Sequence, residues 1–238
     1  MTHALEIQHL NFKFAPQAPY FFKDLTVSFE KGRIHFIRGF NGAGKSTLFR
    51  LLRGKLEKQE VVQGQIVVDG NVQTLETSKE QYNALNTINM VQQKFDVMLA
   101  DQLSFEQNLR LANLPEQPGL AGLPAHKPVP AFVQRFGIDI KKPVHLLSGG
   151  QRQILAILMA LQKSTNILLL DEPTAALDEQ NAEMVMLFLH DLVASSGLTV
   201  LIICHDRELV MRYAQQSYFE LVVDAQGVRS VVQQRFQE

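Results

Sequence analysis

The stretch Gly39-Phe40-Asn41-Gly42-Ala43-Gly44-Lys45-Ser46-Thr47 decides the fold of this 238-residue chain, because it fills the pattern G-x-x-x-x-G-K-[ST] at every fixed position. Glycines let the backbone curl so tightly that successive N–H groups point at phosphate oxygens, and the following helix adds its positive N-terminal end. We expect Lys45 to reach the β and γ phosphates of a nucleotide and Ser46 to hold Mg²⁺, which prefers hard oxygen ligands. The stretch therefore predicts a phosphate-binding loop.

The residues on either side supply the strand and the helix that such a loop requires. Residues 33–38 are predicted to form a short buried strand, and residues 45–53 carry three leucines at helical spacing. Gly54 is suited to end that helix. The alternative, a glycine-rich surface turn, does not explain these flanking elements.

A second signal is the stretch of residues 166–173, in which the apolar run of residues 167–170 ends in the acidic pair Asp171 and Glu172. A strand that is apolar on both faces belongs in the middle of a parallel sheet, and open α/β sheets bind ligands at the carboxyl ends of their strands. We expect Asp171 to help hold Mg²⁺ through its water shell and Glu172 to polarise the water that attacks a γ phosphate. For this segment alone, an acidic turn after a core strand is the alternative.

The third signal is Leu147-Ser148-Gly149-Gly150-Gln151, shortly upstream of the acidic pair. Ser148 is of the residue type that caps helix N-termini, and the helix predicted after it has apolar residues on one face. A helix start with close backbone access is an anion site. The sequence therefore predicts a second anion site besides the one at Lys45.

Together, these three motifs make the chain resemble the ATP-binding cassette (ABC) family over nearly its whole length, specifically the nucleotide-binding subunit of a bacterial-type transporter. The resemblance implies an α/β fold: a P-loop NTPase core with a central, mainly parallel sheet, an antiparallel β subdomain and an α-helical subdomain. We expect one domain over residues 1–238. Residues 1–92 and 164–238 would form the core with the β subdomain, and residues 93–163 the helical subdomain with the signature.

The resemblance also assigns roles to isolated residues. Phe14 lies where the family places an aromatic residue that stacks on adenine, with Phe12 as a competing candidate. Gln93 is similar to the glutamine that ligates Mg²⁺ and senses the γ phosphate; Gln92 is the alternative, although alignment on the apolar residues 90–91 favours Gln93.

Two further roles follow from the same resemblance. His205 follows an apolar strand predicted over residues 199–204 and is similar to the switch histidine that contacts the γ phosphate; otherwise such a histidine is as often a satisfied polar residue. Asp178 is the acid of a loop that crosses to the opposite subunit, where Ala175 replaces the family's usual serine.

The implied ligand is ATP with Mg²⁺. In the family, the signature of one subunit closes on the γ phosphate bound by the other, so that two ATP molecules lie between the subunits of a head-to-tail dimer. The partner is a second copy or a homologous cassette. The expected ATP-binding residues are Phe14, Gly39, Asn41, Gly42, Ala43, Gly44, Lys45, Ser46, Thr47, Ser148, Gly149, Gly150, Gln151 and Asp178; the expected metal ligands are Ser46, Gln93 and Asp171; and the expected catalytic residues are Glu172, His205 and Gln93.

Composition restricts the partners. A formal net charge of −1 argues against a nucleic-acid surface. The only cysteine, Cys204, allows no disulfide within the chain, which agrees with a reducing cytosol. The N-terminus lacks the regions of a signal peptide, and no apolar run approaches the roughly 20 residues that span a bilayer. We expect a soluble chain at the cytoplasmic face of the membrane, attached through separate transmembrane permease subunits.

Apolar residues crowd between Gln93 and the signature helix: Phe95, Val97, Met98, Leu99, Leu103 and Phe105. In the family, this region forms a groove that receives a short helix of the membrane subunit. Local core packing is the alternative. We expect Met98 and Leu99 to be the exposed part of this lip.

Other elements are predicted from periodicity. Residues 5–14, 24–29 and 65–69 have the pattern of strands and resemble the family's antiparallel edge sheet, and residues 179–195 form a helix that Gly197 ends. Residues 114–130 are predicted to be a proline-rich loop.

Three functional classes share parts of these motifs. The ATP-hydrolysing subunit of a transporter fits the complete set, with a separate substrate-binding protein as a further possible partner. A soluble assembly ATPase of the same family has the same motifs and is the alternative. A small-molecule phosphotransferase would explain the phosphate loop but not the signature.

Overall fold

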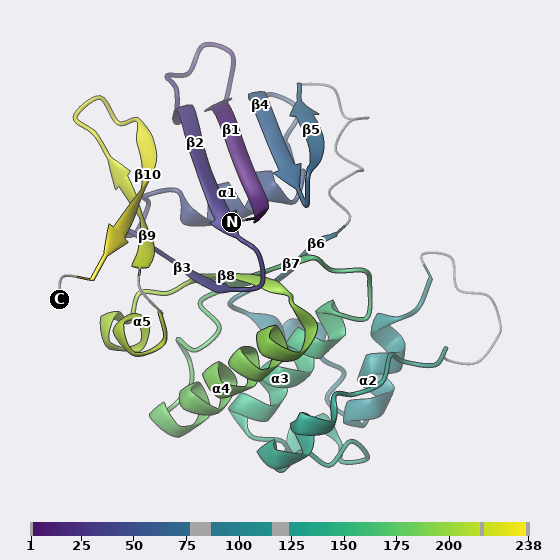
Figure 1. Cartoon of the computed structure of the whole chain (residues 1–238). Helices are drawn as coiled ribbons and strands as arrows, with labels where there is room; N and C mark the ends of the chain where they lie inside the picture. The colour runs from purple at the N-terminus through teal and green to yellow at the C-terminus, as the bar shows by residue number, and fades with distance from the viewer. Residues whose placement is uncertain (1, 77–86, 116–123, 215–216, 237–238) are drawn as a thin grey trace.

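The computed structural model describes residues 2–76, 87–115, 124–214 and 217–236 (Figure 1). Its strands are β1 (His3–Lys13), β2 (Phe22–Glu30), β3 (Ile34–Arg38), β4 (Val61–Val68), β5 (Asn71–Leu75), β6 (Ile88–Val91), β7 (Ile167–Asp171), β8 (Thr199–Ile203), β9 (Ser217–Val223) and β10 (Arg229–Arg235). Its helices are α1 (Lys45–Leu52), α2 (Phe105–Ala112), α3 (Gly149–Ala160), α4 (Glu179–Ser196) and α5 (Arg207–Tyr213), with 3₁₀ turns η2 (Phe95–Met98), η3 (Ala131–Phe136) and η4 (Val144–Leu146).

The described strands pair in one mixed sheet with the order β5-β4-β1-β2-β10-β9-β3-β8-β7-β6. Strands β9, β3, β8, β7 and β6 are mutually parallel, whereas β1 is antiparallel to both β2 and β4, and β4 is antiparallel to β5. Strand β10 joins the two parts, because it is antiparallel to β9 and pairs with β2 only through Arg229 and Phe22. The α/β architecture predicted from the sequence is therefore observed.

The central parallel strands β7 and β8 are buried on both faces. In β7, Leu168 and Leu170 pack into the apolar cluster that contains α3 and α4, whereas Ile167 and Leu169 pack into the cluster that contains α1. Residues of β8 alternate in the same way. The apolar run of residues 167–170 is thus explained by helices on both sides of the sheet, with α3 and α4 below it in Figure 1.

Helix ends follow their capping residues. Ser148 and Ser104 each accept a hydrogen bond from the backbone N–H of a glutamine three residues on, which bonds back, so that α3 and α2 begin with capping boxes. Asp178 and Asp206 cap α4 and α5. Gly197 ends α4 with φ 68°, as predicted.

Most predicted elements agree with the structure within one to four residues at their ends. The hairpin β9–β10 and helix α5 are not among the sequence predictions. The proline-rich loop predicted over residues 114–130 lies partly outside the described residues, since residues 116–123 are not described.

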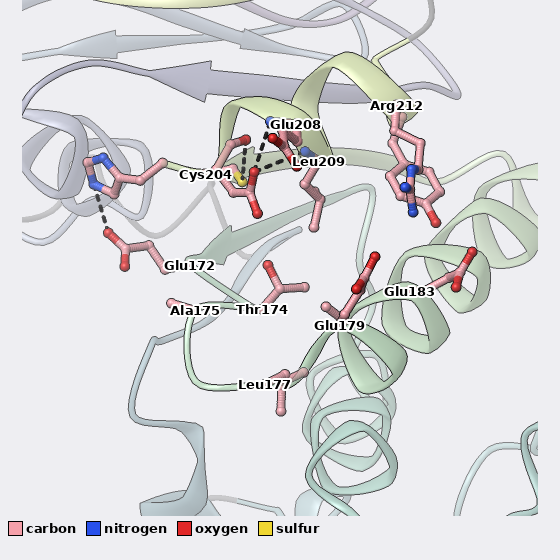
Figure 2. A pocket seen from close by; sticks show the side chains of 14 residues that line it. Glu172, Thr174, Ala175, Leu177, Glu179, Glu183, Cys204, Glu208, Leu209 and Arg212 are labelled. Atoms are coloured by element: carbon pink, nitrogen blue, oxygen red, sulfur yellow. Dashed lines mark hydrogen bonds and ion pairs between the residues drawn. The ribbon is translucent and has the colours of Figure 1, made fainter.

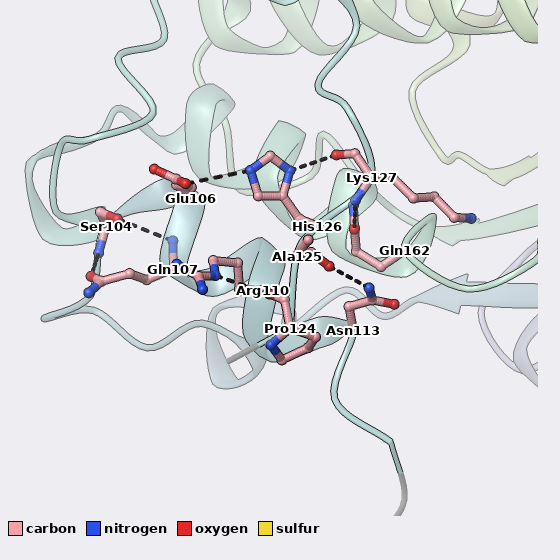
Figure 3. A network of polar contacts seen from close by, with 10 residues as sticks. All are labelled: Ser104, Glu106, Gln107, Arg110, Asn113, Pro124, Ala125, His126, Lys127 and Gln162. Carbon is pink, nitrogen blue, oxygen red and sulfur yellow. Dashed lines mark hydrogen bonds and ion pairs between the residues drawn. The ribbon is translucent and has the colours of Figure 1, made fainter. Parts of the chain in front are cut away.

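Hydrogen bonds connect residues 124–127 to side chains of α2 and of the residues that follow α2 and α3 (Figure 3). The side chains of Arg110 and Asn113 donate hydrogen bonds to the carbonyls of residues 124 and 125 at 3.0 and 2.6 Å, and Gln162 accepts from the backbone N–H of residue 127 at 2.7 Å. His126 lies 3.8 Å from the carboxylate of Glu106. Side chains of α2 and of the end of α3 thus satisfy the polar backbone of a segment without regular structure.

Candidate functional site

The phosphate loop connects β3 to α1, and its lysine is folded over it. The Lys45 ammonium donates hydrogen bonds to the carbonyl oxygens of Gly39 and Phe40 at 2.8 and 3.1 Å. Burial lowers the pKa of Lys45, against the opposing influence of the carboxylates of Glu172 and Asp171. The loop is therefore curled around the group that is expected to meet phosphate.

Two loop positions require glycine. Gly44 has φ 107°, and a Cβ atom there would lie 2.7 Å from the ring of Phe21. Gly39 has φ 150°, and a Cβ atom there would lie 2.8 Å from the carbonyl oxygen of Leu221. Any side chain would shift the loop or its neighbours.

Asp171 lies at the carboxyl end of β7, where the Ser46 hydroxyl donates to its Oδ2 atom at 3.4 Å. Burial, followed by the charge of Glu172, raises the pKa of Asp171. A hydroxyl and a carboxylate suit Mg²⁺. Within the described residues no group of three or more His, Cys, Asp or Glu side chains could hold a metal ion, so this pair needs further oxygens from water or phosphate.

Glu172 has a donor on each carboxylate oxygen. Gln93 donates to Oε2 at 3.0 Å, and the Nε2 atom of His205 lies 2.9 Å from Oε1. The backbone of Glu172 has φ 51°, a left-handed conformation that is costly for a residue with a side chain. The structure thus brings together three predicted residues that follow β6, β7 and β8.

The two open alternatives can now be compared. Gln93, not Gln92, contacts Glu172. Phe14 is 42% exposed and lines a cavity of about 350 Å³ beside the phosphate loop, whereas Phe12 is 0% exposed and belongs to the core. The geometry supports Gln93 and Phe14.

Phe21 lines the same cavity and was not found from the sequence. Its ring lies 4.8 Å from that of Phe14 at an interplanar angle of 76°. The cavity is also lined by Asn41, Gly42, Gly44, Lys45, Ser46, Thr47, Glu172 and His205. The available signal was the pair of adjacent phenylalanines at residues 21–22. Phe22 is buried as the first residue of β2, and because successive side chains along a strand point to opposite faces, the side chain before it points away from that core.

The signature residues lie elsewhere. Among the described residues that line this cavity there is none from 147–151. The Ser148 hydroxyl donates to Asn181 Oδ1 at 2.9 Å, and the same oxygen accepts from the backbone N–H of Gly150 at 3.1 Å. The structure therefore does not bring the signature and the phosphate loop together within one chain.

Asn181 links the signature to Asp178. The Asn181 amide donates to both carboxylate oxygens of Asp178 at 2.9 Å, and its backbone N–H donates to one of them at 2.8 Å. These bonds lower the pKa of Asp178. Asn181 was missed in the sequence, although its place three residues after a helix cap was a usable signal.

A larger cavity of about 510 Å³ adjoins Glu172 and His205 between α4 and α5 (Figure 2). Glu179 and Glu183 of α4 face it from one side, and Arg212 of α5 from the other. Cys204 also lines it, but burial raises the pKa of this thiol to about 11, so the thiolate that a nucleophile requires is scarce.

The apolar lip differs from its prediction. Met98 is 42% exposed as expected, but Leu99 is partly buried against the apolar cluster around α3, and Val97 is the most exposed of the set at 80%. The reason is local: residues 95–98 form a 3₁₀ turn, after which extended backbone at Leu99 leads the chain back to the core.

The sequence of this chain is similar to those of known proteins. The profile described as ABC transporter matches residues 22–175. Methionine import ATP-binding protein MetN 2 of Rhodopseudomonas palustris is 31% identical over 87% of this chain and 53% of its own length, and MetN of Haemophilus ducreyi is 36% identical over 76% and 52%. The chain spans about half the length of these relatives.

Solved structures are similar over almost the whole chain. cbiO1 of Clostridium perfringens, part of the ABC transporter complex cbiONQ, has 26% identity and a TM-score of 0.76, covering 99% of this chain and 89% of that chain. The ATP-binding cassette MJ0796, a dimer bound to ADP and Pi, has 22% identity and a TM-score of 0.65, covering 98% and 99%, which shows the fold alone. No helix in the described part of the chain is long and apolar enough to cross a membrane.

Proposed function

Because the chain belongs to the ABC transporter family and has the ABC ATPase fold, we propose that it binds and hydrolyses ATP to drive a transporter whose membrane-spanning subunits are separate chains. The convergence of Gln93 and His205 on Glu172, beside the phosphate loop, is the observation that carries this proposal. A soluble assembly ATPase would share this site, but the relatives are named import proteins, which supports transport and its inward direction.

ATP binding begins with the loop. The backbone N–H groups of residues 39–47 hold the phosphates, and Lys45 exchanges its carbonyl partners for β and γ oxygens. Ser46 directly and Asp171 through water would hold Mg²⁺, with Gln93 as a third ligand. Bound Mg²⁺ offsets the charge that develops on the phosphate oxygens. Phe14 stacks on the adenine ring.

Hydrolysis requires a free oxygen on Glu172. Both of its carboxylate oxygens have donors in this structure, at 3.0 Å from Gln93 and 2.9 Å from His205. A carboxylate that polarises water must accept a hydrogen bond from that water. We therefore expect Gln93 and His205 to turn toward Mg²⁺ and the γ phosphate when ATP binds, which releases Glu172 to act as the base.

The second half of the site would come from another chain. Ser148, Gly149, Gly150 and Gln151, with Asp178, do not line the cavity at their own phosphate loop. In a head-to-tail dimer with a second copy or a homologous cassette, they would close on the γ phosphate of the partner. In this arrangement, the anion site predicted at the start of α3 would bind the γ phosphate of the partner's ATP.

The same proposal includes how the chain is divided and attached. Residues 1–92 and 164–238 form the core with the β subdomain, and residues 93–163 form the helical subdomain with the signature. The exposed lip at Val97 and Met98 receives a helix of the permease subunits, which hold the chain at the cytoplasmic face of the membrane. A separate substrate-binding protein completes an import system.

The testing experiment uses a variant that binds ATP but does not hydrolyse it. Tagged Glu172→Gln protein is captured with Mg·ATP from detergent-solubilised native cells, and the accompanying proteins are identified. We expect a membrane protein with several spans at roughly one copy per cassette, since trapped ATP stabilises the assembly by mass action. Lys45→Ala, which cannot hold phosphate, is the matched control and should lose it. Recovery of soluble partners only, in repeated trials, would favour the assembly ATPase.

A further inference from the structure

Arg229, the first residue of β10, joins the two parts of the sheet. Its backbone N–H donates to the carbonyl oxygen of Phe21 at 3.0 Å, and its pairing with Phe22 is the single register pair between β10 and β2. The contact brings the C-terminal hairpin β9–β10 to the strand that begins beside the nucleotide cavity. These backbone contacts persist whatever side chain residue 229 carries, proline excepted.

The side chain of Arg229 is held against an aromatic ring. Its guanidinium carbon lies 3.9 Å from the centroid of the Phe21 ring, within the range of a cation–π interaction. One terminal nitrogen donates to the carbonyl of Gly227 in the β9–β10 turn, which orients the planar group. The Nε atom is buried and has no hydrogen-bond partner among the described residues. The described contacts of the guanidinium are thus the Phe21 ring and the carbonyl of Gly227.

Besides contacting Arg229, the Phe21 ring lines the nucleotide cavity. Its ring edge leaves no room for a side chain at Gly44 of the phosphate loop, and it meets the ring of Phe14 at 4.8 Å and 76°. Both rings line the cavity of about 350 Å³. Phe14 thus has a second aromatic ring at an interplanar angle of 76° to it, and Arg229 contacts that second ring.

We propose that Phe21 forms a second wall of the base-binding site and that Arg229 is a positioning residue that fixes this wall from the β9–β10 hairpin. The inference rests on the proposed binding of ATP with its base at Phe14. It makes the affinity for the nucleoside part of ATP depend on a residue that lines no part of the cavity.

Comparing ATP with its triphosphate part alone distinguishes this role of Arg229 from a general effect on folding. Among the described residues, no hydrogen bond, ion pair or ring contact joins Arg229 to Lys45 or to the loop, so the binding of inorganic tripolyphosphate with Mg²⁺ reports on the loop alone. An aromatic wall contributes only when a base is present. A loss confined to ATP therefore identifies the wall, because a distorted loop would weaken both ligands.

The experiment measures the Kd of Mg·ATP and of Mg·tripolyphosphate by calorimetry for three variants of the full chain. Arg229→Leu removes the planar cation, Arg229→Lys keeps the charge without the plane, and Arg235→Leu changes an exposed arginine on the same strand as the control. For Arg229→Leu we expect the Kd of ATP to rise about 3- to 10-fold, the range of a cation–π contact. The Kd of tripolyphosphate should stay within about twofold, and Arg229→Lys should lie between wild type and Arg229→Leu.

Turnover and a second background complete the test. The KM for ATP should rise in Arg229→Leu while kcat is unchanged. In a Phe21→Leu background, Arg229→Leu should have no further effect on ATP affinity, because the arginine acts through the ring that is already gone. If Arg229→Leu does not fold, Arg229→Lys replaces it in both tests. The Kd of ATP is then compared between Arg229→Lys alone and Arg229→Lys in the Phe21→Leu background.

Three results would overturn the inference: unchanged ATP affinity in the Arg229 variants, an equal loss for ATP and tripolyphosphate, or a full additional loss in the Phe21→Leu background. Failure of the proposed ATP binding, on which the inference rests, is distinguishable from all three, since the wild-type chain would then bind neither ligand.

Discussion

Helices α1 and α3 both begin at a glycine-rich turn that is suited to an anion, yet their N-termini are prepared differently. At α1 the capping residue is Gly44, and no side chain accepts a hydrogen bond from the first N–H groups. At α3 the cap is Ser148, which accepts from the backbone N–H of Gln151 in a capping box. The first helix start leaves its donors for a ligand, whereas the second has already used part of them.

The surroundings show the same contrast. The start of α1 lies in a cavity with Lys45, Asp171 and Glu172 close by. The start of α3 lies against α4, where a Cβ atom on Gly149 or Gly150 would come within 2.8 Å of Leu177 or Asn181. The first region gathers its phosphate-loop, lysine and carboxylate residues from one chain. The other is a rigid surface that contributes to a ligand held elsewhere, which is what a head-to-tail dimer requires.

The strongest test of the first region is Glu172→Gln. We expect kcat to fall about 10³-fold, within the range for loss of a general base, because the amide cannot take a proton from water. ATP affinity should stay close to that of the wild type, since Gln93 and His205 lose a partner but the phosphate loop is untouched. Measurement of ATPase rate and Kd on one preparation checks this, and residual hydrolysis above about a tenth of the wild-type rate would assign the base to another residue.

The next effect separates two glycines of the loop. Gly44→Ala should weaken ATP binding about 100-fold, because the methyl group meets the Phe21 ring in addition to the cost of a left-handed φ. Gly42→Ala is the matched control: φ is 85° there, but a Cβ atom meets nothing within 4 Å. It should cost about tenfold or less. Equal losses, measured by calorimetry, would mean that backbone conformation alone is responsible.

The second region is tested by Ser148→Ala. This change removes a helix cap that contributes about 1 kcal/mol. In the proposed dimer it would also remove a hydroxyl near the partner's γ phosphate. We expect ATP binding by the monomer to be unchanged and kcat at dimerising concentration to fall about tenfold, the equivalent of one lost hydrogen bond.

Ser104→Ala provides the matched control, because Ser104 forms the same capping box on α2. Both variants should lose a similar amount of stability in urea unfolding, but only Ser148→Ala should lose turnover. If Ser104→Ala lowers kcat as much, the effect is one of stability and the comparison of the two helix starts does not hold.

The smallest effect concerns Asp171, whose pKa is raised by burial and by Glu172. A carboxylate with a raised native pKa makes the native state bind more protons than the unfolded state, so stability falls as pH rises toward that pKa. Asp171→Asn should therefore raise the Tm by a few degrees at neutral pH without Mg²⁺. The gain should vanish near about pH 3, where both states of Asp171 are protonated. A gain that persists there would have another cause.

Residues in contiguous motifs could be predicted from the sequence because a few neighbours define their geometry. The loop around Lys45, the pair Asp171 and Glu172, and Ser148 are of this kind. The contact between Phe21 and Arg229 could not be predicted, since it depends on where β10 meets β2, and polar β10 gives no apolar pattern that indicates this pairing.

The lip near α2 shows a third case. The exposure of Met98 was predicted correctly, but the choice of Leu99 over Val97 was wrong because a 3₁₀ turn, not the sequence of apolar residues, decides which side chains face outward. For Asn181, the sequence contained part of the information. Its spacing of three residues from Asp178 could be read from the sequence, but its hydrogen bond with Ser148 could not.

The sheet is continuous, but its two parts meet at the single pair of Arg229 and Phe22. Under a stretching force, a sheet yields where the fewest hydrogen bonds share the load. In a single-molecule pulling experiment, the antiparallel strands should separate from the parallel core at this joint before either part unravels. The nucleotide cavity lies beside this joint. Bound ATP should therefore hold the two parts together and raise the force at which they separate.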